Sequence, residues 1–253
     1  MIFKPLFLAL STYSKIPVPQ FEWTDHNLRY ALCFFPVVGV ICGGLYFGWA
    51  ALSGALSLSG VLFACGAVCL PLLLTGGIHM DGYMDTVDAL SSHAVRERKL
   101  EILKDPHTGA FAVMFCGVYL LAQFGLLFEL YVRDAALAVC PVFVLSRGLS
   151  AALAVGLKPA RGDGMLHTYT KSAGKGACLA SSAVAAALAA GGLFLLAGAW
   201  PCLCAVVFCG LAAAGYAGLV KRQFGGVTGD TAGFFLQLCE LVGMLGLLVG
   251  RLI

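Results

Sequence analysis

The chain has 253 residues, of which 60% are hydrophobic and 11% are charged, whereas soluble domains carry about 25% charged residues. A soluble fold of this size could not bury so much apolar surface, but a protein that faces lipid does not need to. The net charge is only +3, without a basic run suited to nucleic acid. We therefore expect a single membrane-embedded domain over residues 1–253 and no nucleic-acid partner.

Seven stretches are apolar enough to cross a bilayer, for which a helix needs about 20 residues. In chain order they cover residues 31–52, 60–78, 110–131, 135–157, 177–199, 202–220 and 233–251. This pattern predicts an all-α, polytopic membrane bundle with about seven transmembrane helices in contact with the lipid bilayer.

The connections between these spans differ in charge on the two sides of the membrane. Thirteen of the 16 lysine and arginine residues fall on the side that holds the N-terminus. The opposite side has only Arg133 and Arg251, and Arg147 lies inside a span. Because basic residues collect in cytoplasmic loops, we predict a cytoplasmic N-terminus. The long polar loops, where we expect the function to reside, would face the cytoplasm as well.

An acidic motif, which contains Asp81, Asp85 and Asp88, follows the second span. In a helix these three carboxylates share a sector about 60° wide, where they repel one another unless a cation neutralises them. Mg²⁺ prefers oxygen ligands and often bridges carboxylates to substrate phosphates, so we predict a catalytic Mg²⁺ site. A solvated helix start with acids favoured by the helix dipole explains one or two of the acids. Gly82 leaves room for a phosphate or a neighbouring helix.

Residues 96–109 indicate a short amphipathic surface helix followed by a loop. Asp105 would lie just before the third span, where it is a further candidate metal ligand. Lys104 and His107 are candidate substrate-binding residues, as is His79 directly before the acidic motif. For either histidine, a polar residue at the membrane interface is an equally good interpretation.

A glycine-rich turn, residues 225–231, separates the last two spans. Such a turn before a helix offers backbone N–H groups to an anion, which makes Gly225, Gly226 and Thr228 candidate substrate-binding residues. Asp230 could cap the next helix or bind the metal. Glycine-rich turns are common in loops, so this signal is weak in isolation.

Arg147 and Glu240 lie inside predicted spans, about 15 Å and 11 Å from their cytoplasmic ends at 1.5 Å per residue. An isolated charge at such a depth costs on the order of 3 kcal/mol. We predict that both face the bundle interior, either as a mutual pair or beside a wet cavity. Arg147 is also a candidate substrate-binding residue and Glu240 a candidate metal ligand.

Several of these motifs together resemble the cobalamin synthase family, also called adenosylcobinamide-GDP ribazoletransferase. The similar segments follow one another in the family's order over nearly the whole chain: residues 12–19, 34–39, 75–88, 100–105 with Gly109, 146–148, and 225–231 with Glu240. Three departures concern local packing: Ala89 replaces a common glycine, Tyr83-Met84 a commoner Leu-Ala, and Pro106 the usual serine. Every carboxylate is retained.

The resemblance implies a Mg²⁺-dependent enzyme of the inner membrane. Its reaction joins adenosylcobinamide-GDP to α-ribazole or α-ribazole 5′-phosphate, releases GMP and gives adenosylcobalamin or its phosphate. Such transfers depend on positioning and charge neutralisation, for which the three aspartates, with Asp105 and Asp230, would hold one or two Mg²⁺ ions. The resemblance is compatible with a homo-oligomer and with association with other corrinoid-pathway enzymes.

Two other classes of membrane protein share part of this pattern. A CDP-alcohol phosphatidyltransferase also uses membrane-embedded aspartates, but its pattern requires Ala-Arg where Asp85-Thr86 stands, and a further acidic run is missing after Asp88. A transporter could use Arg147 and Glu240 as a charge relay, although its site would lie near the midplane and internal repeats would be expected.

Overall fold

The computed structural model describes residues 3–253, and this part of the chain is helical, with no strand beyond one isolated bridge between Pro159 and Val227. The elements, in chain order, are α1 (Phe3–Tyr13), α2 (Asp25–Leu28), η1 (Ala31–Phe34), α3 (Phe35–Ala55), α4 (Gly60–Thr75), α5 (Ile78–Ser91), α6 (Arg96–Ile102), α7 (Ala110–Val132), η2 (Ala136–Val139), α8 (Cys140–Gly156), α9 (Met165–Ser172), α10 (Lys175–Ala197), α11 (Ala199–Gln223) and α12 (Gly229–Leu252). The predicted all-α architecture is confirmed.

Six segments of the described chain are long and apolar enough to cross a membrane. They are Asp25–Ala55, Ala110–Val132, Ala136–Gly156, Lys175–Ala197, Ala199–Gln223 and Gly229–Leu252. A seventh is reached only if α4 and α5, which are bent by 94° relative to each other, count as one broken span. The outer surface carries exposed large apolar side chains such as Leu121 and Leu195, as expected for a multi-pass membrane protein.

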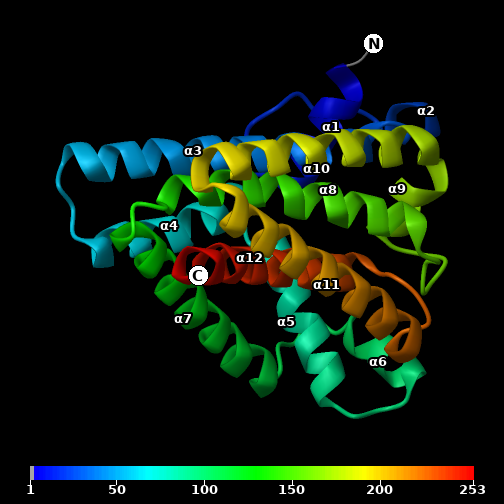
Figure 1. Cartoon of the computed structure of the whole chain (residues 1–253). Coiled ribbons are helices and arrows are strands. Elements are labelled where there is room, and N and C mark those ends of the chain that lie inside the picture. The colour runs from blue at the N-terminus through cyan, green and yellow to red at the C-terminus, as the bar shows by residue number, and fades with distance from the viewer. Residues whose placement is uncertain (1–2) are drawn as a thin grey trace.

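The predicted second span, residues 60–78, corresponds to α4, which ends three residues earlier than predicted. α4 ends at Thr75, and Gly76 and Gly77 follow with φ values of 64° and 76°, a left-handed conformation that glycine adopts readily. The chain turns there, and in Figure 1 α5 points away from the set of roughly parallel helices α3, α8 and α10. The acidic motif therefore sits on a separate helix after the bend.

The core of the bundle is built around α12, which packs against α11, α5, α8 and α7. Glycines on α12 let the neighbouring backbones approach: a Cβ on Gly246 would lie 2.7 Å from the Cα atom of Ala205 in α11. Small residues at helix contacts are the usual way for membrane helices to pack closely. This packing holds α12 in the centre of the bundle, and the cavity described below lies at its N-terminal end.

Arg147 of α8 and Glu240 of α12 form an ion pair inside the bundle, and each is 1% exposed. The guanidinium donates to Glu240 Oε1 and also to the carbonyl oxygen of Phe143 at 3.1 Å. Ser146 Oγ donates to the same glutamate oxygen at 3.3 Å. The predicted mutual pair is confirmed, and it ties α8 to α12.

Candidate functional site

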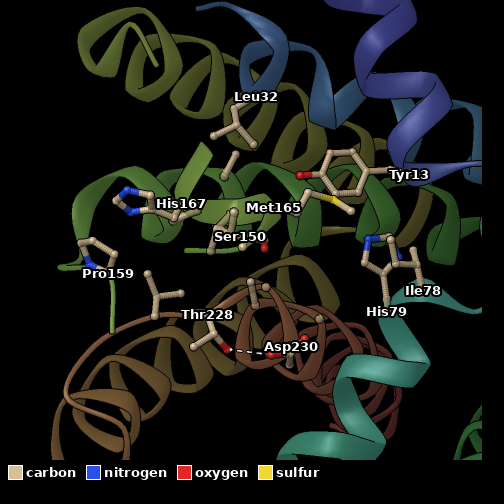
Figure 2. A pocket seen from close by; sticks show the side chains of 18 of the residues that line it. Tyr13, Leu32, Ile78, His79, Ser150, Pro159, Met165, His167, Thr228 and Asp230 are labelled. Atoms are coloured by element: carbon tan, nitrogen blue, oxygen red, sulfur yellow. Dashed lines mark hydrogen bonds between the residues drawn. The ribbon is translucent and has the colours of Figure 1, made fainter. Parts of the chain in front are cut away.

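A cavity of about 320 Å³ lies at the end of the bundle where α9 and the N-terminus of α12 meet. Its apolar wall includes Tyr13, Leu32, Phe35 and Ile78. The polar and charged residues that line it are His79, Asp81, Ser150, Arg161, Asp163, His167, Thr228 and Asp230. In Figure 2, Tyr13, Ile78 and His79 lie together on one side of the cavity, opposite Pro159 and His167, with Thr228 and Asp230 below.

The acidic helix α5 reaches this cavity through a close contact with α12. A Cβ on Gly82 would lie 2.7 Å from the carbonyl oxygen of Asp230, and a Cβ on Gly233 would lie 3.0 Å from that of His79. The room that Gly82 was predicted to provide is thus occupied by a neighbouring helix. This contact brings the start of α5, with Asp81, beside the start of α12, with Asp230.

Replacing Gly82 by alanine should therefore push α5 and α12 apart. We expect a loss of stability of about 1–3 kcal/mol, as is usual when atoms are inserted into a tightly packed site, together with lower activity. Thermal unfolding of the purified protein checks this. The matched control is Gly215→Ala on α11, where a Cβ would meet nothing within 4 Å and alanine should be neutral or stabilising. Equal stability of the two variants would contradict the close contact.

The carboxylates of α5 and α12 share one electrostatic environment. The charge of Asp85 interacts with the charges of Asp81, Asp230 and Asp88. Asp81 and Asp230 line the cavity, whereas Asp85 and Asp88 are half-buried beside it. Among residues 3–253, however, no three His, Cys, Asp or Glu side chains are arranged to hold a metal ion by themselves. Four of the six predicted ligands, Asp81, Asp85, Asp88 and Asp230, are therefore gathered into one region without forming a closed ligand set.

Asp88 also contacts the start of α7. Its Oδ1 accepts a hydrogen bond from the backbone N–H of Ala112 at 3.3 Å, and its carboxylate packs directly against Gly109. A carboxylate is favourable at a helix N-terminus, where N–H groups lack partners inside the helix. The contact also explains Gly109, since a side chain there would collide with Asp88. The carboxylate spacing on its own predicts only metal binding and catalysis for Asp88.

Asp230 is held by two polar neighbours. Its Oδ2 accepts from Thr228 Oγ1 at 3.3 Å and from Arg161 Nη2 at 3.4 Å. The side chain that caps α12 is Thr228, in a capping box with Thr231. Asp230 is therefore not the N-cap of this helix. Arg161 was missed as a site residue because it looks like any other basic residue of a long polar loop. Only the fold shows that it lines the cavity.

The glycine-rich turn packs against the loop that carries Arg161. The N–H of Gly226 donates to the carbonyl oxygen of Val220 at 3.1 Å, and that of Val227 donates to Lys158 at 2.9 Å. A Cβ on Gly226 would collide with the backbone of residues 158–160. The amide groups of Gly226 and Val227 are therefore used inside the fold, so the expectation that Gly226 presents a free amide to an anion gains no support, and Gly225 does not line the cavity. Thr228, by contrast, lines the cavity.

The three predicted residues of the loop before α7 lie outside the cavity lining. Asp105 accepts from the backbone N–H of His107 at 2.9 Å, a bond that, together with the His107 ring, holds the pKa of Asp105 below its ordinary value. The His107 side chain is 90% exposed. Lys104 forms an ion pair of 2.7 Å with Asp163 and lowers the pKa of that carboxyl. Lys104 thereby joins this loop to the loop that lines the cavity.

Arg147 and Glu240 are likewise absent from the cavity lining. The polar groups of the two side chains are directed at each other within the core. Their predicted roles toward substrate and metal receive no support from this placement, whereas the pairing does.

Comparison with known proteins agrees with the order of motifs along the chain. A family model described as cobalamin-5-phosphate synthase matches residues 5–248. The chain belongs to the cobalamin-5-phosphate synthase family. An adenosylcobinamide-GDP ribazoletransferase of Lachnoclostridium phytofermentans is 40% identical over 251 residues, which cover 97% of this chain and 94% of the relative.

More distant members of the cobalamin-5-phosphate synthase family match over similar lengths. The ribazoletransferase of Pseudomonas savastanoi is 31% identical, with 96% of this chain and 98% of the relative covered. The ribazoletransferase of Mesorhizobium japonicum is 32% identical, and the match covers 94% of this chain and 90% of the relative. No solved structure matches the chain. Membership in the cobalamin-5-phosphate synthase family decides against the phosphatidyltransferase and transporter alternatives.

Proposed function

We propose that this protein transfers the adenosylcobinamide phosphoryl group from adenosylcobinamide-GDP to α-ribazole or α-ribazole 5′-phosphate. The main support is the relative that carries the ribazoletransferase name and is 40% identical over 97% of the chain. The cavity adds support, because the carboxylates of Asp81 and Asp230 lie together in its lining, where a phosphoryl donor and an acceptor could meet. GMP is the second product.

We propose Mg²⁺ as the required cofactor. The acidic side chains near the cavity, Asp81, Asp85 and Asp230, offer only oxygen donors, which are the ligands that Mg²⁺ prefers. Mg²⁺ is usually bound through one or two carboxylates together with substrate phosphates and water, so the lack of a three-residue ligand set among the described residues agrees with its usual chemistry. Bound there, it would neutralise the pyrophosphate of the donor.

The protein's own part in the reaction is to place the acceptor hydroxyl in line with the donor phosphorus. The hydroxyl oxygen forms the new P–O bond as the bond to the GMP oxygen breaks. Asp81 and Asp230, which line the cavity, are the candidates to accept the hydroxyl proton. Thr228 and Arg161 orient Asp230 through the hydrogen bonds described above.

We also propose that the reaction takes place on the cytoplasmic side of the inner membrane. The loops that line the cavity follow α8 and precede α12, and both belong to the set of long basic loops that the positive-inside rule assigns to the cytoplasm. Donor and acceptor are both polar molecules with a phosphate or hydroxyl groups, which a cytoplasmic opening would admit directly.

The test uses the purified protein in lipid nanodiscs with adenosylcobinamide-GDP and α-ribazole. We expect GMP release that depends on both substrates, stops when EDTA removes Mg²⁺ and returns when Mg²⁺ is restored. A parallel sample with α-ribazole 5′-phosphate shows which acceptor is used better. Absence of GMP release with both acceptors, in protein that is folded and supplied with Mg²⁺, would overturn the proposal.

A further inference from the structure

We infer that the cavity is the binding site of the acceptor, a flat heteroaromatic riboside, with its base held against Tyr13, Phe35 and His79. This inference rests on the proposed function. It goes further by assigning the cavity to the acceptor and not to the donor, and by placing the base at the aromatic end of the cavity. The corrinoid ring of the donor would stay outside.

The size of the cavity favours the smaller substrate. A volume of about 320 Å³ is at the lower end of the range of about 300–1,000 Å³ for small-molecule sites. A benzimidazole riboside is of a size to fill such a space. A corrinoid with an attached nucleotide is several times larger, so only the phosphate end of the donor can approach the polar edge.

The wall on one side of the cavity is suited to an aromatic base. The ring of Tyr13 lies 4.4 Å from that of Phe35 and 6.0 Å from that of His79, measured between centroids. The Tyr13 and His79 rings are nearly parallel, at 13°. Ile78 completes the apolar surface on this side, as Figure 2 shows. Stacked and tilted aromatic arrangements of this kind favour a further flat ring.

A buried polar atom without a protein partner points to a ligand on the same side. His79 is 5% exposed, and its Nε2 finds no hydrogen-bond partner within residues 3–253. A buried polar atom in that state is costly unless something else pairs with it. The hydroxyl of Tyr13 points into the cavity in Figure 2, and burial raises the pKa of this phenol, so it stays a donor. A ring nitrogen or a ribose hydroxyl would satisfy these groups.

The polar edge of the cavity would then receive the sugar. Asp81 and Asp230 line the same cavity as His79, so a riboside with its base at the aromatic wall directs its hydroxyl groups toward the two carboxylates. This is the arrangement that the proposed transfer needs, since the attacking oxygen must meet the donor phosphate at the acidic edge.

The experiment narrows the cavity with Ala154→Leu on α8, whose side chain lines it and is 4% exposed. Binding of α-ribazole alone is measured by calorimetry in nanodiscs, and KM is measured for each substrate. We expect about a tenfold weaker affinity and a tenfold higher KM for α-ribazole, with the KM for adenosylcobinamide-GDP within about twofold; tenfold corresponds to 1.4 kcal/mol. The control Ala152→Leu, on the same helix outside the cavity lining, should change neither KM.

A second pair of variants covers the case in which Ala154→Leu fails to fold. Tyr13→Leu removes part of the aromatic wall and should raise the KM for α-ribazole about tenfold, whereas Tyr30→Leu, a 43% exposed tyrosine outside the cavity lining, should not. Unchanged acceptor binding in Tyr13→Leu, or a rise confined to the donor KM, would overturn the inference. Wild-type protein that binds α-ribazole but releases no GMP would instead contradict the proposed function and leave the acceptor site supported.

Discussion

Protein with Asp81 replaced by asparagine should fold normally and release GMP on the order of 10²–10³-fold more slowly than wild type, the size of loss seen when one electrostatic contact in a transition state is removed. Asp81 is exposed at the start of α5 and lines the cavity. Asparagine keeps its size but not its charge, so that both metal binding and proton transfer suffer. The measurement is GMP release at saturating substrates.

The control for this variant is Asp134→Asn, on a loop between η2 and α7 that does not line the cavity. Asp134 is exposed and has a φ of 53°, a conformation that asparagine also tolerates, so stability and rate should be unchanged. If Asp81 binds the metal, a raised Mg²⁺ concentration should restore part of the Asp81→Asn activity. Near-normal rates in Asp81→Asn at low Mg²⁺ would refute the role of this carboxylate.

Arg147→Ala should destabilise the protein by about 3–5 kcal/mol, because removing one partner leaves the other charge buried without compensation. The pair is almost completely shielded from solvent, with the two side chains 1% and 2% exposed. Arg147 also packs against Gly39 of α3, where a Cβ would lie 2.9 Å from its Cδ atom. The free energy of unfolding in detergent, measured with a denaturant, gives the size of the effect.

Two comparisons make this prediction specific. Arg133→Ala breaks a surface pair with Glu129, in which the side chains are 42% and 40% exposed, and should cost less than about 1 kcal/mol. The double variant Arg147→Met/Glu240→Leu removes both buried charges and should be more stable than Arg147→Ala alone. A stable double variant with full activity would show that the pair has a structural role. A double variant that is stable but inactive would instead support a direct role of Arg147 or Glu240 toward substrate or metal.

Hydropathy along the chain was enough to predict most of the bundle, because each lipid-crossing helix must be apolar over its whole length. It could not predict the break after α4, since an apolar average over residues 60–78 does not register the left-handed turn at Gly76 and Gly77. The glycine pair itself was the available signal.

The site was predicted less completely than the fold. Carboxylate spacing on α5 was visible in the sequence, and so was the approach of another element at Gly82. The position of Tyr13 in the cavity wall was not visible in the sequence. One aromatic residue in an apolar N-terminal segment resembles many others until the fold brings its ring beside His79 of α5. The contact of Asp88 with α7 was hidden for the same reason, since its partner Ala112 lies 24 residues away.

The ion pair between Arg147 and Glu240 also imposes an order on insertion into the membrane. The two residues are 93 positions apart, so α8 is synthesised and enters the bilayer well before α12. During that interval Arg147 lacks its partner, and α8 bears a penalty of about 3 kcal/mol by itself. The penalty is relieved only when the last helix arrives. A nascent chain that stops short of α12 thus leaves Arg147 of α8 without its partner in the bilayer.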